Sequence, residues 1–90
     1  MYSILPYTQR QAKKLGVMIH PSTTPGKKID VYDGKKIATI GDTSYGDYPT
    51  FLRDKGKAYA DERRRLYNIR HKKDSSKKGT PGWFAKNLLW

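Results

Sequence analysis

The stretch KAYADERRRLYNIRHKK, residues 57–73, constrains the fold of this chain more than any other segment. Its acids, Asp61 and Glu62, come early and its bases come late, an order that suits the dipole of an α-helix. Asp61 also lies three and four residues before Arg64 and Arg65, the spacing at which charges pair on a helix surface. The pattern therefore predicts one helix over residues 57–73.

The same helix has a narrow apolar stripe and a wide basic arc. Tyr59, Leu66 and Ile69 share one face at helical spacing, so we expect that face to dock on a core. The remaining surface is dominated by guanidinium and ammonium groups, which fit a negatively charged partner. The bases of this arc are Arg63, Arg64, Arg65, Arg70, Lys72 and Lys73.

The composition of the whole chain is strongly basic, like this arc. The chain has 19 Lys and Arg against 8 Asp and Glu, a net charge of +11 over 90 residues. Repulsion at that charge opposes folding, and a polyanion or an acidic protein surface would relieve it. Only 36% of the residues are hydrophobic, so we expect one small domain with a small core. Disulfides and thiolate metal sites are excluded because there is no cysteine.

The chain also lacks the patterns of a membrane or secreted protein. No apolar run approaches the roughly 18 residues of a membrane-spanning helix. The first residues do not have the basic start and apolar segment of a signal peptide. We therefore expect no membrane partner, and a protein that stays where it is made or is packaged from there.

Residues 27–41 contain the clearest local pattern, a β-hairpin around Asp33 and Gly34. An Asp-Gly pair suits a two-residue type I′ turn, which would place Val31 opposite Lys36. That register gives one apolar face, expected toward the core, formed by Ile29, Val31, Ala38 and Ile40. The other face would carry Lys28, Asp30, Lys35 and Thr39.

Lysines crowd both strands of this hairpin, and two explanations for them stay open. One is protection of a sheet edge against further strand pairing, and the other is contact with phosphate groups. These lysines are Lys27, Lys28, Lys35 and Lys36.

The segments on either side of the hairpin predict short elements. An apolar arm over residues 1–6 would lie on the domain or dock on another subunit. A short helix over residues 9–15 would be capped by Thr8 and stopped by Gly16, followed by a buried strand at residues 17–19.

Two further helices follow the hairpin. Residues 47–52 suit a short helix with Pro49 near its start, ended by Gly56. The final segment, WFAKNLLW, either closes the domain's own core as a helix or is an exposed anchor, since Trp and Tyr dominate binding hot spots. The aromatic residues expected to pack or to anchor a neighbour are Tyr45, Tyr48, Trp83, Phe84 and Trp90.

Together these patterns predict an α+β fold. We expect a small single domain in which a β-hairpin or short antiparallel sheet is packed by a basic helix and a C-terminal aromatic helix. Residues 1–26 would form an N-terminal arm, short helix and loop. Residues 27–90 would form the basic hairpin–helix domain with its aromatic closing segment.

Catalytic patterns are scarce. No glycine-rich phosphate loop, nucleophile elbow or Rossmann fingerprint occurs. His71 lies among bases, which disfavours a metal beside it. A nuclease would need clustered carboxylates, but turn and cap positions explain Asp33, Asp42 and Asp47. A metal site that uses Asp30 or Asp42 remains a remote alternative. We predict no enzyme, no cofactor, no bound metal and no small-molecule substrate.

The interleaving of bases with aromatic residues points to a binding role. Seven Tyr and two Trp are dispersed among the 19 bases, and such surfaces bind nucleic acid through phosphate contacts, with stacking as an option. No homeodomain, zinc-finger or RNA-recognition pattern is present, so binding would be sequence-independent. The alternative is a merely solvated basic face. The residues expected to meet nucleic acid or an acidic partner are Lys27, Lys28, Lys35, Lys36, Arg63, Arg64, Arg65, Arg70, Lys72, Lys73, Lys77 and Lys78.

Four stretches, taken in order, resemble a family of small basic proteins encoded by large DNA viruses and tailed phages. The motifs are a lysine-flanked strand pair, a glycine-then-Tyr/Asp-Tyr segment, a basic helix ending in Arg-His-Lys, and a final Gly-aromatic…Leu-Leu-Trp. They match residues 27–41, 45–48, 62–73 and 82–90, and residues 1–26 lie outside the resemblance. The family's linker often carries a tryptophan before the closing motif, whereas DSSKKGT here has none.

The resemblance implies a viral origin and a place in the virion, without an activity. We therefore expect a minor capsid-associated structural protein whose basic face meets an acidic capsid surface or packaged DNA. It would lie in the virion, and in the host cytoplasm before assembly. A sequence-independent nucleic-acid-binding protein is the alternative, and a metal-dependent nuclease is a remote one.

Overall fold

A three-stranded antiparallel sheet in the order β1-β2-β3 forms the centre of the computed structural model, which describes residues 2–90. The strands are β1 (Met18–Pro21), β2 (Lys27–Asp33) and β3 (Lys35–Asp42). The helices are α1 (Pro6–Leu15), α2 (Tyr48–Lys55), α3 (Lys57–Arg70) and α4 (Pro81–Leu89). The predicted α+β class is confirmed.

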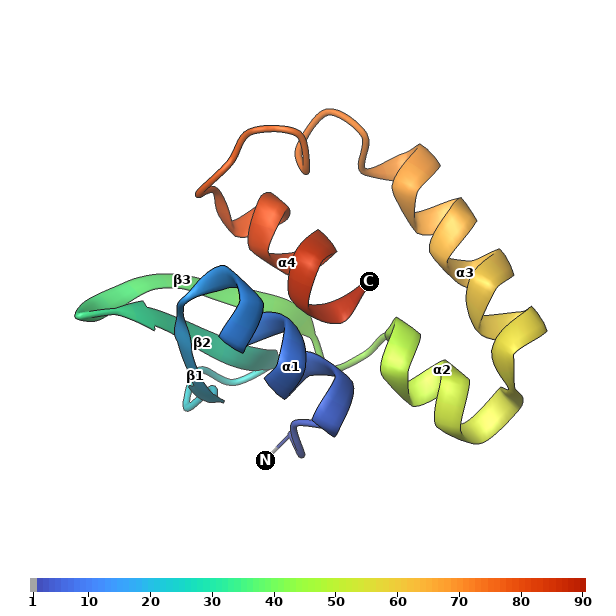
Figure 1. Cartoon of the computed structure of the whole chain (residues 1–90), viewed down its shortest axis with the longest axis horizontal. Coiled ribbons are helices and arrows are strands. Elements are labelled where there is room, and N and C mark those ends of the chain that lie inside the picture. Colours follow the sequence, from blue (N-terminus) through green and yellow to red (C-terminus); the bar gives the residue numbers. More distant parts are fainter. Residues whose placement is uncertain (1) are drawn as a thin grey trace.

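The elements form two groups (Figure 1). Helix α4 packs on β3 and on α1, while α2 and α3 pack on each other beside the sheet. The radius of gyration is 12.3 Å, close to the roughly 12 Å expected for one compact domain of this length. Among residues 2–90, no helix combines the length and the apolar character needed to cross a membrane.

The N-terminal segment belongs to the same sheet and core as the rest of the chain. Strand β1 pairs with β2, with Ile19 opposite Val31 and His20 opposite Asp30. Helix α1 packs on both β1 and α4. The division expected between residues 26 and 27 therefore falls between two paired strands.

The core face of the hairpin is as predicted, although its register is not. Ile29 and Val31 are fully buried, and Ala38 and Ile40 are nearly so. Val31 lies opposite Ala38 rather than Lys36, and Ile29 lies opposite Ile40. Because a shift of two residues returns every side chain to the same face, the wrong register still gave the right core.

The turn explains the shifted register. Of the two turn residues, Gly34 has a positive φ, of 77°, and Asp33 does not, whereas the predicted type I′ turn needs a positive φ at both. The register is irregular between Val31 and Tyr32, where a β-bulge takes up the extra residue, Ile37.

Helix α4 closes the domain's own core, the first of the two explanations above. Phe84, Leu88 and Leu89 are buried against the sheet and α1. The Thr80 hydroxyl accepts a hydrogen bond from the Trp83 backbone N–H at 3.3 Å and caps the helix.

The basic helix differs from its prediction in length and in the face it buries. α3 ends at Arg70 rather than at residue 73. It buries Ala60 and Tyr67, whereas Tyr59 is 44% exposed and Ile69 is 62% exposed. The predicted face was wrong because α3 packs mainly on α2, so the position of α2 selects the buried stripe.

The elements near the N-terminus also need correction. Helix α1 begins at Pro6 and its cap position is Leu5, so Thr8 is a buried helical residue rather than a cap. Gly16 ends the helix in the left-handed conformation, as predicted. Strand β1 lies at the sheet edge, and Met18 is 64% exposed, so the strand is not buried.

The packing of α4 yields a test at Gly82. Alanine ordinarily stabilises a helix relative to glycine, by up to about 1 kcal/mol. A Cβ on Gly82 would overlap the backbone carbonyl of Asp74, which cannot move independently of its chain. We expect Gly82→Ala to lower the free energy of unfolding by about 1–3 kcal/mol in urea titrations. A higher urea midpoint would contradict this close approach.

Candidate nucleic-acid interface

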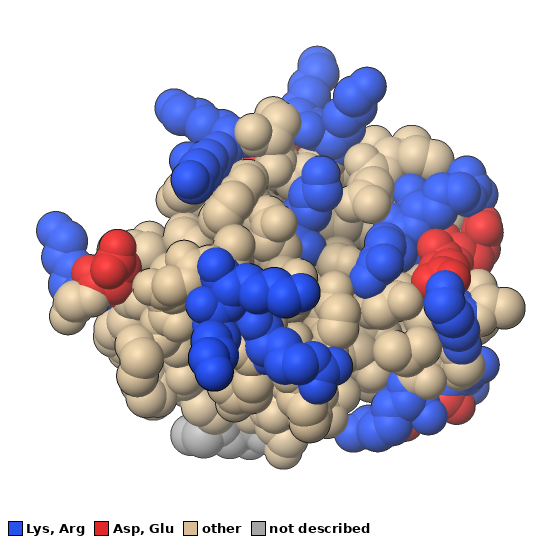
Figure 2. Space-filling view, in the orientation of Figure 1, with Lys and Arg blue, Asp and Glu red and all other residues tan. Residues whose placement is uncertain are grey.

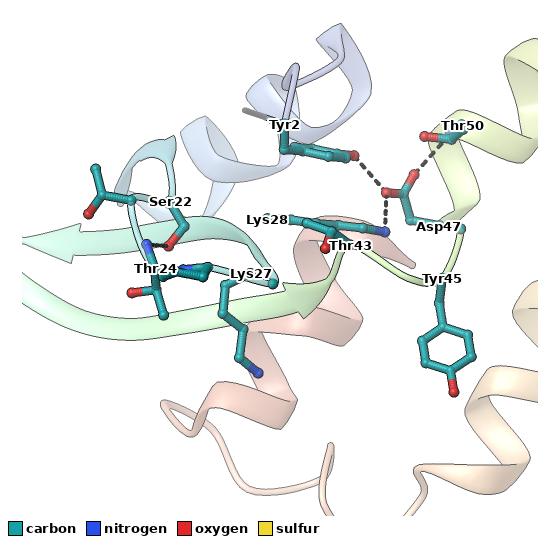
Figure 3. Close-up of a pocket in the computed structure, with 13 residues that line it drawn as sticks. Tyr2, Ser22, Thr24, Lys27, Lys28, Thr43, Tyr45, Asp47 and Thr50 are labelled. Carbon is teal, nitrogen blue, oxygen red and sulfur yellow. Dashed lines mark hydrogen bonds and ion pairs between the residues drawn. The ribbon is translucent and has the colours of Figure 1, made fainter.

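Two hollows open beside the ends of β2 and β3. The first, which we call the arm hollow, measures about 740 Å³ and is lined by Tyr2, by the loop before β2 and by the turn after β3 (Figure 3). The second, which we call the aromatic groove, measures about 530 Å³ and lies between the sheet, α3 and α4. They share Lys27, Lys28, Tyr45 and Gly46. The groove is lined by Lys27, Lys28, Gly41, Asp42, Tyr45, Gly46, Phe51, Arg63, Tyr67, Arg70, His71, Ala85, Leu89 and Trp90.

A buried carboxylate, Asp47, organises the arm hollow. It caps α2 by accepting the Thr50 backbone N–H at 3.0 Å, as a cap at this position should. It also accepts the Tyr2 hydroxyl at 2.6 Å and the Lys28 Nζ at 2.9 Å (Figure 3). Burial raises the pKa of Asp47, but the hydrogen bonds from Tyr2, Lys28 and Thr50 outweigh it and hold that pKa below its ordinary value.

This network removes Lys28 from the predicted binding surface. Lys28 is 4% exposed, and its ammonium is engaged by Asp47. Burial and the hydrogen bond to Asp47 raise the pKa of Tyr2, so its hydroxyl stays protonated and donates. Lys28 is therefore an internal cation and not a surface contact for phosphate.

Asp30, expected on the outer face of the hairpin, is also buried. Its Oδ1 accepts the Ser22 hydroxyl at 2.8 Å and the Thr39 hydroxyl at 2.9 Å, and Lys36 Nζ lies 3.9 Å from Oδ2. Burial raises the pKa of Asp30, but those hydrogen bonds and the Lys36 charge have the larger effect and hold that pKa below its ordinary value. The outer face of β2 thus carries a second buried polar network.

The carboxylates considered for a nuclease do not converge. Asp42 accepts the Ser44 backbone N–H at 2.8 Å in the turn after β3. Asp30 and Asp47 lie in the separate networks described above. Within residues 2–90, no group of three or more metal-ligating side chains comes together.

The structure divides the arginines of α3 between different surroundings. The Arg64 guanidinium lies 3.4 Å above the Tyr48 ring and donates to the Tyr7 hydroxyl at 3.1 Å. Arg63 lies 5.8 Å above the Phe51 ring, on the side of the groove. The continuous basic arc predicted for this helix is thus interrupted by two inward-facing arginines.

Other bases of the predicted surface remain at the surface. Arg65 is exposed and pairs with Glu62, with Nε 3.1 Å from Oε2. Figure 2 shows Lys and Arg side chains spread over one face, with acids confined to small groups. The exposed bases at the hairpin and after α3 are Lys27, Lys35, Lys36, Arg70, Lys72, Lys73, Lys77 and Lys78.

Three rings form one wall of the aromatic groove. The Tyr67 ring stacks on the Trp90 ring, with ring centroids 4.5 Å apart and an interplanar angle of 11°. It also stacks on the His71 ring, at a centroid distance of 4.3 Å and an interplanar angle of 24°. His71 Nδ1 lies 3.0 Å from Asp74 Oδ2. Phe51 of α2 also lies against Trp90, with the two ring centroids 6.0 Å apart. The stack fixes the end of α3 against the end of α4.

Tyr45 and two arginines supply the rest of the groove's chemistry. Tyr45 is 73% exposed and lies in the turn between β3 and α2. Lys27 and Tyr45 point to the same side, away from Asp47 (Figure 3). Arg63 Nε is buried without an acceptor among residues 2–90, which costs about 1–3 kcal/mol. Arg70 makes no ion pair within that range and lines the groove.

The predicted aromatic residues separate into packing residues and one free ring. Phe84 and Tyr48 are buried, and Trp83 and Trp90 are half-buried within the domain. Tyr45 packs on little and stays open to solvent.

Sequence reasoning missed Phe51 and Tyr67 in the groove. A signal was available for Tyr67, because it follows the small residue Ala60 by seven positions and so shares its helix face.

No family model, curated protein or solved structure matches the chain. The resemblance to viral proteins therefore stays a prediction.

The Lys28–Asp47 pair predicts a stability difference that depends on pH. Lys28→Met leaves a buried carboxylate without its cation, so we expect unfolding at pH 7 to cost about 3 kcal/mol less than in the wild type. Because the pKa of Asp47 is lowered on folding from its ordinary 3.8, the pair's contribution is complete above about pH 4. It is then lost as the pH falls through the folded-state pKa.

Urea titrations from pH 7 to pH 2.5 would check this, with the exposed Lys35→Met as a control expected to lie within about 0.5 kcal/mol of the wild type. A difference in the free energy of unfolding between wild type and Lys28→Met that stays constant with pH would contradict the ion pair.

Proposed function

We propose that this protein binds nucleic acid without sequence specificity, through exposed bases around the aromatic groove. The observation that carries the proposal is a convergence of three distant segments. β2 supplies Lys27, the turn before α2 supplies Tyr45, and α3 supplies Arg70 to one groove. Bases that neutralise phosphate and rings that stack on nucleobases are the two components of such sites.

The state of the acids favours an external partner over a merely solvated basic face. Six of the eight acidic side chains already pair with a base or a histidine of the same chain. Few acidic side chains therefore remain for further pairing. Within residues 2–90, most of the 19 bases have no carboxylate within ion-pair distance. Their mutual repulsion is relieved by a polyanion.

The lack of specificity follows from how the bases are presented. Bidentate reading of base edges needs side chains fixed toward a nucleic-acid groove. Arg63 and Arg64 instead lie over Phe51 and Tyr48. Lys72 and Lys73 are exposed in the turns after α3, where they suit contacts with the phosphate backbone.

The proposal predicts a salt dependence that can be assigned to the bases after α3. The logarithm of the observed binding constant for duplex DNA falls linearly with the logarithm of the salt concentration, with a slope of about −0.9 per phosphate contact. The triple variant Arg70→Gln, Lys72→Gln, Lys73→Gln should therefore flatten that slope by about 2–3. Fluorescence anisotropy with a labelled random-sequence duplex over a salt series measures it.

A matched control removes the same charge from another surface. Arg10, Lys13 and Lys14 are exposed on α1 and do not line the groove. Changing these three to Gln should leave the slope close to that of the wild type. Equal effects from the two triples would show net charge without a site. Displacement of the duplex by polyglutamate at equal charge concentration would indicate an acidic protein partner instead.

We further propose that the binding takes place in a virus particle, on packaged DNA or against an acidic capsid surface. The support is the resemblance of residues 27–90 to proteins of large DNA viruses and tailed phages. Before assembly the protein would lie in the host cytoplasm.

A particle census tests this setting. Mass spectrometry of purified particles of the encoding virus should find the protein at a constant copy number relative to the capsid protein. Its absence from particles would remove the virion from the proposal and leave a nucleic-acid-binding protein that acts in the infected cell.

A further inference from the structure

The ring of Tyr45 makes no side-chain hydrogen bond and no ring–ring contact with any other residue of the described range 2–90. It is 73% exposed, although burial of an aromatic ring is among the larger gains available to a small domain. Tyr45 and Lys27 line both hollows and point to the same side (Figure 3). A large open ring beside a base is what a stacking platform for nucleobases requires.

The two hollows differ in what they offer a ligand. In the arm hollow, Tyr2 and Lys28 are engaged by Asp47, and Ser22 is engaged by Asp30. Tyr45 lines both hollows and Arg70 lines the aromatic groove alone, and within residues 2–90 neither side chain has a partner of this kind. Volume does not separate the two, because about 740 Å³ and about 530 Å³ both fall within the usual range of about 300–1,000 Å³ for ligand pockets.

The groove has the components that distinguish a single strand from a duplex. In a duplex the faces of the bases are covered by stacking, and only phosphates and base edges remain accessible. A single strand presents its base faces, which can stack on a ring such as Tyr45 while neighbouring phosphates meet Lys27 and Arg70. The stacked rings of Trp90, Tyr67 and His71 also line the groove.

We propose that the aromatic groove takes an unpaired nucleobase of a single strand, stacked on Tyr45, with the flanking phosphates on Lys27 and Arg70. The protein therefore prefers single-stranded nucleic acid to duplex. This inference rests on the proposed function and adds to it the form of nucleic acid that is bound. It makes base stacking, and not charge alone, responsible for part of the affinity.

An abasic strand separates stacking from charge. The experiment compares labelled oligothymidine of roughly 12 nucleotides, within the usual site sizes of about 4–16, with an abasic strand of equal length at one salt concentration. The two strands carry the same phosphates. Stacking of one base contributes about 1–3 kcal/mol, so the wild type should bind the abasic strand about 5-fold or more weakly. A duplex with equal total phosphate should also bind more weakly than oligothymidine.

Variants at Tyr45 assign the effect to the ring. Tyr45→Ala should lower the affinity for oligothymidine to near that for the abasic strand, and leave the abasic affinity unchanged. Tyr45→Phe keeps the ring and should retain the preference. The control Tyr32→Ala removes a tyrosine whose ring contacts His20, away from the groove, and should also retain it.

The possible results distinguish failure of the stacking proposal from failure of the proposed function. Equal affinity for the two strands, together with a normal salt dependence, would overturn stacking and leave the proposed function standing. Binding to neither strand nor to duplex would overturn both. A Tyr45→Ala variant that weakens the abasic strand as much as oligothymidine would show that the ring acts through the fold, and would overturn its role as a platform.

Discussion

The buried ion pair between Lys28 and Asp47 is the interaction on which the rest of the arrangement depends. It joins the second residue of β2 to the cap of α2, and the Tyr2 hydroxyl adds the N-terminal arm to the same carboxylate. α2 and α3 pack closely on each other. Side-chain contacts connect them to the remainder of the domain: Lys28 to Asp47, Arg64 to Tyr7, and Tyr67 to Trp90. Breaking this pair would therefore loosen one side of the aromatic groove as well as expose a charge to an apolar interior.

The sequence predicted the elements whose causes are local. Gly16, Gly56 and the Asp47–Pro49 pair mark helix ends because their backbone preferences act within one turn. The hairpin's core face was also predictable, since alternation along a strand survives a two-residue change of register. The bulge at Ile37 was not predictable, because the Asp-Gly pair allows more than one turn.

Long-range packing decided what the sequence could not. The stripe of Tyr59 and Ile69 on α3 is as regular as the pair Ala60 and Tyr67, and periodicity alone does not choose between them. The choice is made by α2, against which α3 packs, and by Trp90, which stacks on Tyr67. In the same way, the alternation in β2 places Lys28 outward, but no local pattern shows that a carboxylate 19 residues later will cover it.

The candidate site depends on the same long-range assembly. Its rings come from the turn at Tyr45, from α2, from α3 and the turn after it, and from the end of α4, segments that share no sequence pattern. The groove therefore lies between the sheet with α4 on one side and the α2–α3 pair on the other, and a bound strand would contact both groups. Because the two groups are joined mainly by side chains, such a ligand both neutralises the repulsion among the bases and adds contacts across the joint. By mass action it stabilises the folded chain, so binding and folding of this highly charged domain are thermodynamically coupled.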